Sequence, residues 1–228
     1  MAFPVFGTQV DTDFAASVTS MAVSLPASIS SGDLLLAFSE VRNAGTWTEP
    51  SGWTELDAQL GGSSVGELTV HYKIADGTEG TTATWTASAG TTAAWHTVKI
   101  TGWHGTTVPE VTKSSGDFST QPNPPSLTPS WGSADTLWVE VAGNTATANL
   151  TTGGSTGYSG YALNIASSGG AQCNLASAYR QVAAATEDPG EMANAGSIRY
   201  WAAMTIGVRP SAGGGGSPPA NSGLLSMF

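Results

Sequence analysis

The chain has 228 residues, of which only 11% are charged, and its formal net charge is −10 at neutral pH. Seven basic residues scattered along the sequence cannot form a stripe that neutralises phosphates, so the composition argues against nucleic acid and anionic membrane surfaces as partners. The single cysteine, Cys173, excludes an intrachain disulfide framework and a cysteine-based zinc site, and we expect it to be a small core residue.

The first half of the chain shows the alternating pattern of half-buried β-strands. The clearest run is Glu67–Ile74, in which apolar residues alternate without a break with polar ones, and His71 belongs to the polar set. Glycine, serine and aspartate between such runs predict turns, one of them at Ala89–Gly90. We predict strands at residues 18–25, 33–40, 53–60, 67–74, 81–87 and 93–102.

A polar, proline-containing connector is predicted at residues 106–125, and beyond it the pattern of the first half restarts. Corresponding landmarks keep their order at nearly constant separations: Asp33 and Asp135 (102), Trp53 and Tyr158 (105), Tyr72 and Tyr179 (107), Trp95 and Trp201 (106), Ile100 and Ile206 (106). Small insertions in hairpin loops produce such a drift. The sequence therefore predicts two pseudo-repeats, at about residues 18–104 and 126–210.

Two architectures fit this duplication. One is a single all-β domain over residues 1–210, an antiparallel, jelly-roll-like β-sandwich in which the halves share a core. The other is a pair of separate immunoglobulin-sized sandwiches. We favour the single sandwich because no clear flexible linker separates the halves.

Residues 211–228 have a different composition. A glycine- and proline-rich stretch predicts a flexible linker, and it is followed by Leu-Leu-Ser-Met-Phe. We expect these apolar side chains to anchor the chain in a neighbouring subunit; they are Leu224, Leu225, Met227 and Phe228. The opposite end has neither a basic segment nor a long apolar run, so we expect no signal peptide and synthesis in a cytoplasm.

No motif in the sequence predicts a chemical reaction. Gly62–Gly66 and Gly153–Gly157 both match G-x-S-x-G, but the first runs directly into a strand and the second lies in a loop, so we interpret both as turns. No two histidines share an element at a metal-ligand spacing, and His96 is expected to pack. We therefore predict no catalytic residue, no metal and no cofactor.

Three of the eight tryptophans fall on the predicted outer faces of the sheets: Trp95, Trp138 and Trp201. Exposed aromatic side chains at these positions could stack on sugars or form a protein interface. Alternatively, long loops cover them.

Several turns and strand starts resemble those of virion structural proteins of tailed bacteriophages. The resemblance covers residues 1–210 and rests on Leu25–Phe38, Pro50–Thr54, Tyr72–Gly80, Ile100–Trp103 and Trp131–Trp138. It implies a non-enzymatic component of a virus particle, such as a capsid decoration (cement) or head-fibre protein. The partners implied are the major capsid protein or other virion proteins, together with further copies of the chain. The alternative is a tail-fibre or receptor-binding module that recognises host glycans through exposed aromatic residues.

Overall fold

The computed structural model describes residues 2–42, 45–62, 66–117, 121–146, 150–168, 171–194 and 200–212, and every structural statement below concerns these residues. They form β-strands connected by turns and loops, and the strands pair antiparallel. The predicted all-β antiparallel sandwich is confirmed. Among these residues no helix is long and apolar enough to cross a membrane.

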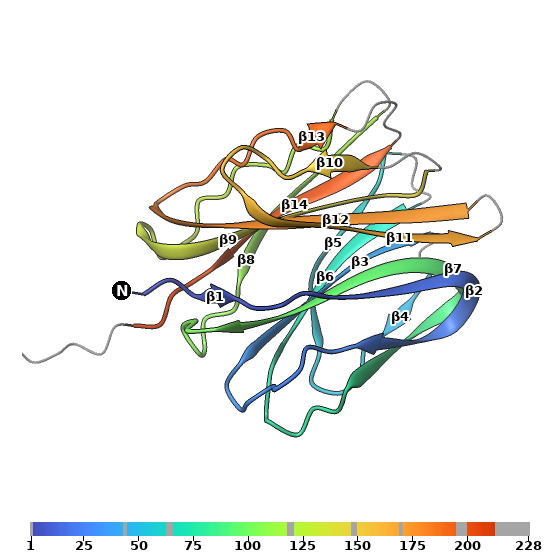
Figure 1. Ribbon diagram of the computed structural model, residues 1–228, viewed down its shortest axis with the longest axis horizontal. Coiled ribbons are helices and arrows are strands. Elements are labelled where there is room, and N and C mark those ends of the chain that lie inside the picture. Colours follow the sequence, from blue (N-terminus) through green and yellow to red (C-terminus); the bar gives the residue numbers. More distant parts are fainter. Residues whose placement is uncertain are drawn as a thin grey trace, which may run out of the picture.

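The first half of the chain forms one sheet, with strand order β1-β7-β3-β6-β5, and both β2 and β4 also pair with β7. Its strands are β1 (Val5–Phe6), β2 (Val10–Ser24), β3 (Leu34–Arg42), β4 (Trp47–Thr48), β5 (Thr54–Leu60), β6 (Gly66–Ile74) and β7 (Thr82–Thr101). In Figure 1 this sheet is the lower, curled layer.

The second half forms the other sheet, with strand order β11-β12-β9-β14-β8. Its strands are β8 (Glu110–Gly116), β9 (Ala134–Asn144), β11 (Ser159–Ser168), β12 (Ala171–Ala184) and β14 (Trp201–Val208). A separate two-stranded ribbon, β10 (Thr151–Gly153) with β13 (Ala193–Asn194), lies over the outer side of this sheet (Figure 1).

Two local predictions are wrong. The turn expected at Ala89–Gly90 lies inside β7, which continues from Thr82 to Thr101 because β2 pairs along both of its ends. The register between the two strands shifts in the middle, and such shifts let a strand bend without ending. The connector expected at residues 106–125 contains the strand β8, which pairs with β14 at the edge of the second sheet.

The duplication is visible in the strand pairing. The order β5-β6-β3-β7 in one sheet corresponds to β11-β12-β9-β14 in the other. Thr54 pairs with Tyr72 and Ser159 with Tyr179, and the differences 159 − 54 = 105 and 179 − 72 = 107 equal the separations of the sequence landmarks. The register of each hairpin also shifts just after this pair, so even the β-bulge is duplicated.

For the remaining landmarks, the strand registers show that other residues of the two halves are equivalent than the sequence alone suggested. Leu35 pairs with Lys73 and Trp138 with Arg180, so β9 corresponds to β3 at a separation of 138 − 35 = 103, one more than the two aspartates suggested. By the same reasoning Trp95, which pairs with Ser39, corresponds to Ala203, which pairs with Ala142. Trp95 and Trp201 therefore both lie on the outer face of their sheets, but Trp201 lies two residues before Ala203, the position equivalent to Trp95.

The two sheets share one apolar core. It takes residues such as Leu36 and Val98 from the first sheet and Val139 and Ile206 from the second, all fully buried. Cys173 belongs to this core, as expected. Two further apolar clusters lie on the outer faces of the sheets. One is enclosed by the curl of the first sheet, and the other lies between the second sheet and the segments that contain Leu150 and Met192.

Polar contacts join the sheets along both lateral edges. On one side, the Asn164 side-chain amide of β11 donates to the carbonyl oxygens of Thr12, at 2.9 Å, and Trp95, at 3.1 Å. On the other, the Lys113 ammonium of β8 lies 2.6 Å from Asp57 and donates to the Ala58 carbonyl oxygen of β5 at 2.8 Å. Since β5 corresponds to β11 and β2 to β8, the contact between β11 and β2 is the counterpart of the contact between β5 and β8.

One turn and its cation are also repeated in both halves. Gly52 and Gly157 have φ angles of +81° and +87°, and each lies against a basic side chain, Lys73 or Arg180. Lys73 Nζ lies 3.0 Å from Glu79 Oε1, and Arg180 donates to its own glutamate, Glu187, at 2.9 Å. The Glu79 carboxylate also accepts from the backbone amides of residues 76 and 77, so it caps this turn.

Replacing Gly157 with alanine is expected to lower the free energy of unfolding by about 1–2 kcal/mol, because a side chain at positive φ is strained. Chemical denaturation measures this change. Gly80→Ala is the matched control, since a Cβ at Gly80 meets no atom within 4 Å and its φ lies outside the left-handed region. An equal effect of the two substitutions would contradict the strained-turn assignment.

Candidate functional site

The predicted anchor residues Leu224, Leu225, Met227 and Phe228 lie outside the described residues. The structure does fix the point from which they are tethered. The Ser211 amide donates to the Gly102 carbonyl at 3.0 Å, the His104 amide donates to Arg209 at 2.9 Å, and Pro210 bridges to Trp103. The last described residues of the chain are therefore held at a fixed position beside β1 (Figure 1).

Of the two possibilities left open for Trp95, Trp138 and Trp201, the structure excludes an exposed aromatic surface. Their side chains lie on the outer faces of the sheets, as predicted, but they are covered: the first two are 0% exposed and Trp201 is 4% exposed. The curl of the first sheet covers Trp95, and the cluster that includes Leu150 and Met192 covers Trp201. Coverage by loops, the other possibility, holds for Trp201, whereas strands of its own sheet cover Trp95.

His71 lies on this covered outer face, whereas the sequence pattern placed it on a polar surface. Its ring packs against Trp85 and Trp95, with centroid separations of 5.6 and 6.1 Å, and is fully buried. Burial lowers the pKa of His71 to about 4, so the imidazole is neutral at neutral pH. The Nε2 atom lies 3.2 Å from Thr69 Oγ1, which in turn lies 2.6 Å from Ser39 Oγ.

The other nitrogen of His71, Nδ1, is buried without a hydrogen-bond partner among the described residues. Glu55 is the direct cross-strand neighbour of His71 in the β5–β6 hairpin, and Glu49 follows β4. One carboxylate oxygen from each glutamate and one ring nitrogen of His71 all lie within 4.8 Å of one another. We call Glu49, Glu55 and His71 the Glu–Glu–His cluster.

Negative charge accumulates around this cluster. Partial burial raises the pKa of Glu55, and repulsion from Glu67, Glu49 and Asp57 raises it further, whereas Lys113 opposes the shift. Burial likewise raises the pKa of Glu67. The cluster therefore combines mutually repelling carboxylates with a neutral imidazole that has a free nitrogen. These are ligand types that divalent metal ions bind.

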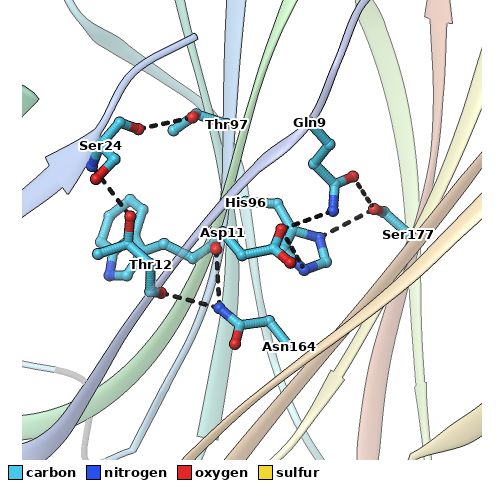
Figure 2. A network of polar contacts seen from close by, with 9 residues as sticks. Gln9, Asp11, Thr12, Ser24, His96, Thr97, Asn164 and Ser177 are labelled. Atoms are coloured by element: carbon cyan, nitrogen blue, oxygen red, sulfur yellow. Dashed lines mark hydrogen bonds and ion pairs between the residues drawn. The ribbon is translucent and has the colours of Figure 1, made fainter. Parts of the chain in front are cut away.

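A second polar network connects the two sheets through their shared core. Figure 2 shows His96 of β7 reaching Ser177 of β12 across the sandwich, with Asp11 of β2 and Gln9, which directly precedes β2, beside it. Ser177 Oγ lies 2.9 Å from His96 Nδ1 and donates to Gln9 Oε1 at 2.7 Å. Asp11 Oδ1 lies 3.6 Å from His96 Nε2 and accepts from Gln9 at 3.0 Å.

Serine, histidine and aspartate also form catalytic triads, but this arrangement is closed. Ser177 and His96 are fully buried, and the serine proton is directed to Gln9. Burial lowers the pKa of His96 to about 4, against the opposing effect of Asp11. A triad needs a nucleophile that a substrate can reach, beside donors for the oxyanion. The network is better suited to holding the residues before β2 and the second sheet in register.

The G-x-S-x-G match at Gly153–Gly157 is confirmed as a turn. The Tyr158 amide donates to the Ser155 carbonyl at 3.1 Å, and the Ser155 hydroxyl donates to the Gly190 carbonyl at 3.1 Å. Ser155 is therefore a structural residue that fixes the loop. The other match, at Gly62–Gly66, includes residues 63–65, which lie outside the described residues.

A buried acid lies between the sheets. Glu40 of β3 is 1% exposed, and a Cβ atom added at Gly66 or Gly143 would overlap its carboxyl oxygens. Burial raises the pKa of Glu40 well above its usual value, and the charge on Glu67 adds to this shift. The two glycines thus form the space in which this carboxyl is held.

Sequence reasoning along single elements misses the Glu–Glu–His cluster, because its ligand atoms come from different elements. Pairing the strands predicted at 53–60 and 67–74 as a hairpin would have placed Glu55 beside His71. Glu49 belongs to the segment before β5 and carries no such signal.

Comparison with protein-family models, curated proteins and solved structures finds no match for this chain.

Replacing Glu40 with glutamine is expected to stabilise the protein progressively as the pH rises. Because the folded-state pKa is raised, the contribution of Glu40 to stability is most favourable below the unfolded-state pKa of about 4.5 and is lost as the pH rises toward the folded-state pKa. Glutamine cannot ionise, so its advantage in unfolding free energy should grow by ~1.4 kcal/mol for each pH unit between those two pKa values. Urea denaturation at pH 5 and pH 8 measures it.

Glu191→Gln, at an exposed position in the second half, provides the control for this experiment. A difference between Glu40→Gln and the wild-type protein that does not change with pH would show that the Glu40 carboxyl has an ordinary pKa.

Proposed function

We propose that this chain is a non-enzymatic structural protein of a tailed-bacteriophage particle, a capsid decoration or head-fibre protein. It docks on the shell, on the major capsid protein or another virion protein, alongside further copies of itself. In this proposal the sandwich binds to the outside of the shell, and residues 213–228 insert into a neighbouring subunit. The sequence resemblance of residues 1–210 suggests the particle, and the geometry of the sandwich supports the role of the tail.

The observation that carries the proposal is that the described residues of both sheets build extensive, fully buried apolar cores. The core clusters are built from residues between Phe6 and Val208. The largest of their side chains, such as Phe38 and Trp85, are fully buried. In this proposal the apolar side chains of residues 224–228 are buried against another molecule.

The fixed exit point supports a tethered anchor. Residues 209–211 are held by backbone hydrogen bonds to residues 102 and 104, so the tether begins at a defined position on the body. The following Gly213–Gly216 predicts a flexible connection. Because a tethered segment meets its receptor at high effective concentration, docking of the body and of the anchor reinforce each other.

The described surface offers little apolar area of its own. The large hydrophobic side chains that remain exposed are dispersed over different elements: Val5, Leu60, Ile74 and Val108. An extended apolar patch is the usual sign of a protein interface, and among the described residues only these four large hydrophobic side chains are exposed. In this proposal the anchor residues therefore supply the apolar contact with the neighbouring subunit.

The alternative, a receptor-binding module that holds glycans through exposed tryptophans, has lost its main support. Trp95, Trp138 and Trp201 are buried and cannot stack on a sugar without opening the fold.

Deletion of residues 213–228 is expected to leave the sandwich folded and to lower its occupancy on purified particles by at least about tenfold. Burying apolar side chains is worth ~25 cal/mol per Å², and a tenfold change requires only ~1.4 kcal/mol. Quantitative gel analysis of particles incubated with the truncated chain measures occupancy. Thermal unfolding of the same protein measures folding.

A full-length variant with serine at Leu224, Leu225, Met227 and Phe228 should lose occupancy to the same extent. The matched control carries serine at Pro218 and Pro219, which alters the linker and keeps the apolar residues, and it should bind like the unmodified chain. Normal occupancy of the truncated chain would overturn the anchoring role.

A further inference from the structure

We propose that the Glu–Glu–His cluster is a binding site for one divalent transition-metal ion of the zinc type. Three residues from separate segments of the chain, Glu49, Glu55 and His71, bring one ligand atom each to within 4.8 Å of the others. The inference is independent of the proposed role in a virus particle.

The buried imidazole points to a ligand. A polar atom buried without a partner is unfavourable, and native structures rarely retain one without a reason. His71 Nδ1 is such an atom among the described residues. A metal ion bound at Nδ1 would complete its coordination, while Nε2–H donates to Thr69 Oγ1, at 3.2 Å. This second contact continues to Ser39 and would fix both the tautomer and the ring orientation.

The ring is also held rigidly. Trp85 and Trp95 flank it, and Trp47 packs edge-on against Trp95 at 6.1 Å. The indole rings leave the imidazole little freedom to turn, so Nδ1 is already oriented before an ion arrives. A preorganised ligand of this kind favours binding because less side-chain entropy is lost.

The carboxylates supply the charge. Glu49 and Glu55 repel each other, and Glu67 and Asp57 add to the negative potential at Glu55. A divalent cation removes this repulsion. Glu49 is half-buried and Glu55 is exposed, so both side chains can move the short distance from 4.8 Å to the ~3.3 Å between ligand atoms that metal bonds of ~2.0 Å require.

The ligand set selects the class of ion. Calcium and magnesium are coordinated by oxygen atoms, whereas an imidazole nitrogen suits zinc, iron, nickel or copper. One imidazole and two carboxylates leave a coordination position for water or for a group from another molecule. The site would also connect three segments: the residue after β4, the bulged strand β5 and the buried strand β6.

The duplicated half provides an internal comparison. The strand registers place Gly160 at the position of Glu55 and Ala178 at that of His71, since 160 − 55 = 105 and 178 − 71 = 107. The two halves share the hairpin and its bulge, but only the first half carries metal-binding side chains at these positions. The cluster is therefore an addition to the common framework rather than a consequence of the hairpin geometry.

Titration of the full chain with Zn²⁺ by isothermal calorimetry tests the proposal. We expect one ion per chain, and at least tenfold weaker binding after Glu55→Gln. The matched control, Glu191→Gln, makes the same chemical change at an exposed position in the other half and should stay within about twofold of the unmodified chain. Ca²⁺ and Mg²⁺ should bind at least tenfold more weakly than Zn²⁺.

A second measurement avoids substitution of the buried histidine. The chain has three histidines, so the imidazole nitrogens are readily assigned by NMR. Adding Zn²⁺ should shift the His71 Nδ1 resonance and leave those of His96 and His104 unchanged. The proposal is overturned if Zn²⁺ does not bind, if Glu55→Gln and the control bind alike, or if the His71 resonances do not respond.

Discussion

The shared apolar layer between the sheets is the contact on which the rest of the structure depends. Each half of the chain forms one sheet, and the inward residues of both, such as Leu36 and Val139, are buried only because the other half is present. Neither sheet could leave that face in water without exposing its large aliphatic side chains. The lateral contacts at Lys113 and Asn164 close the edges of a sandwich that this layer has already assembled.

The duplication explains why the fold is regular and where it is not. Three features occur in both halves: the pairing register of the hairpin, its bulge and the glycine turn that contacts a basic side chain. This is expected if both halves pack their strands in the same way. The outer faces differ: the first sheet curls over its own tryptophans, and the second is covered by the β10–β13 segments. The Glu–Glu–His cluster lies on one of these outer faces, and two of its residues, Glu55 and His71, occupy positions that correspond to Gly160 and Ala178 in the other half.

Local pattern was sufficient to predict most strands of the first half and the landmarks of the repeat, because alternation along β6 and the landmark separations depend on neighbours in sequence. Local pattern did not predict which side chains on the outer faces of the sheets are buried. An outward-facing Trp201 is exposed or covered according to a segment near Met192 that carries no strand-like pattern. His71 shows the same limit, since its surroundings come from β7 and β5 rather than from its own strand. Ala89–Gly90 reads as a turn locally, but pairing with β2 carries β7 through it.

Native-state hydrogen exchange of the central strands tests most directly whether the two halves form one cooperative body. If the sheets depend on their shared core, the slowest amides of β3 and β9 should exchange through the same global unfolding, with equal free energies and equal dependence on denaturant. Slow exchange that persists in one sheet after the other has opened would contradict this account and show that each half is stable alone.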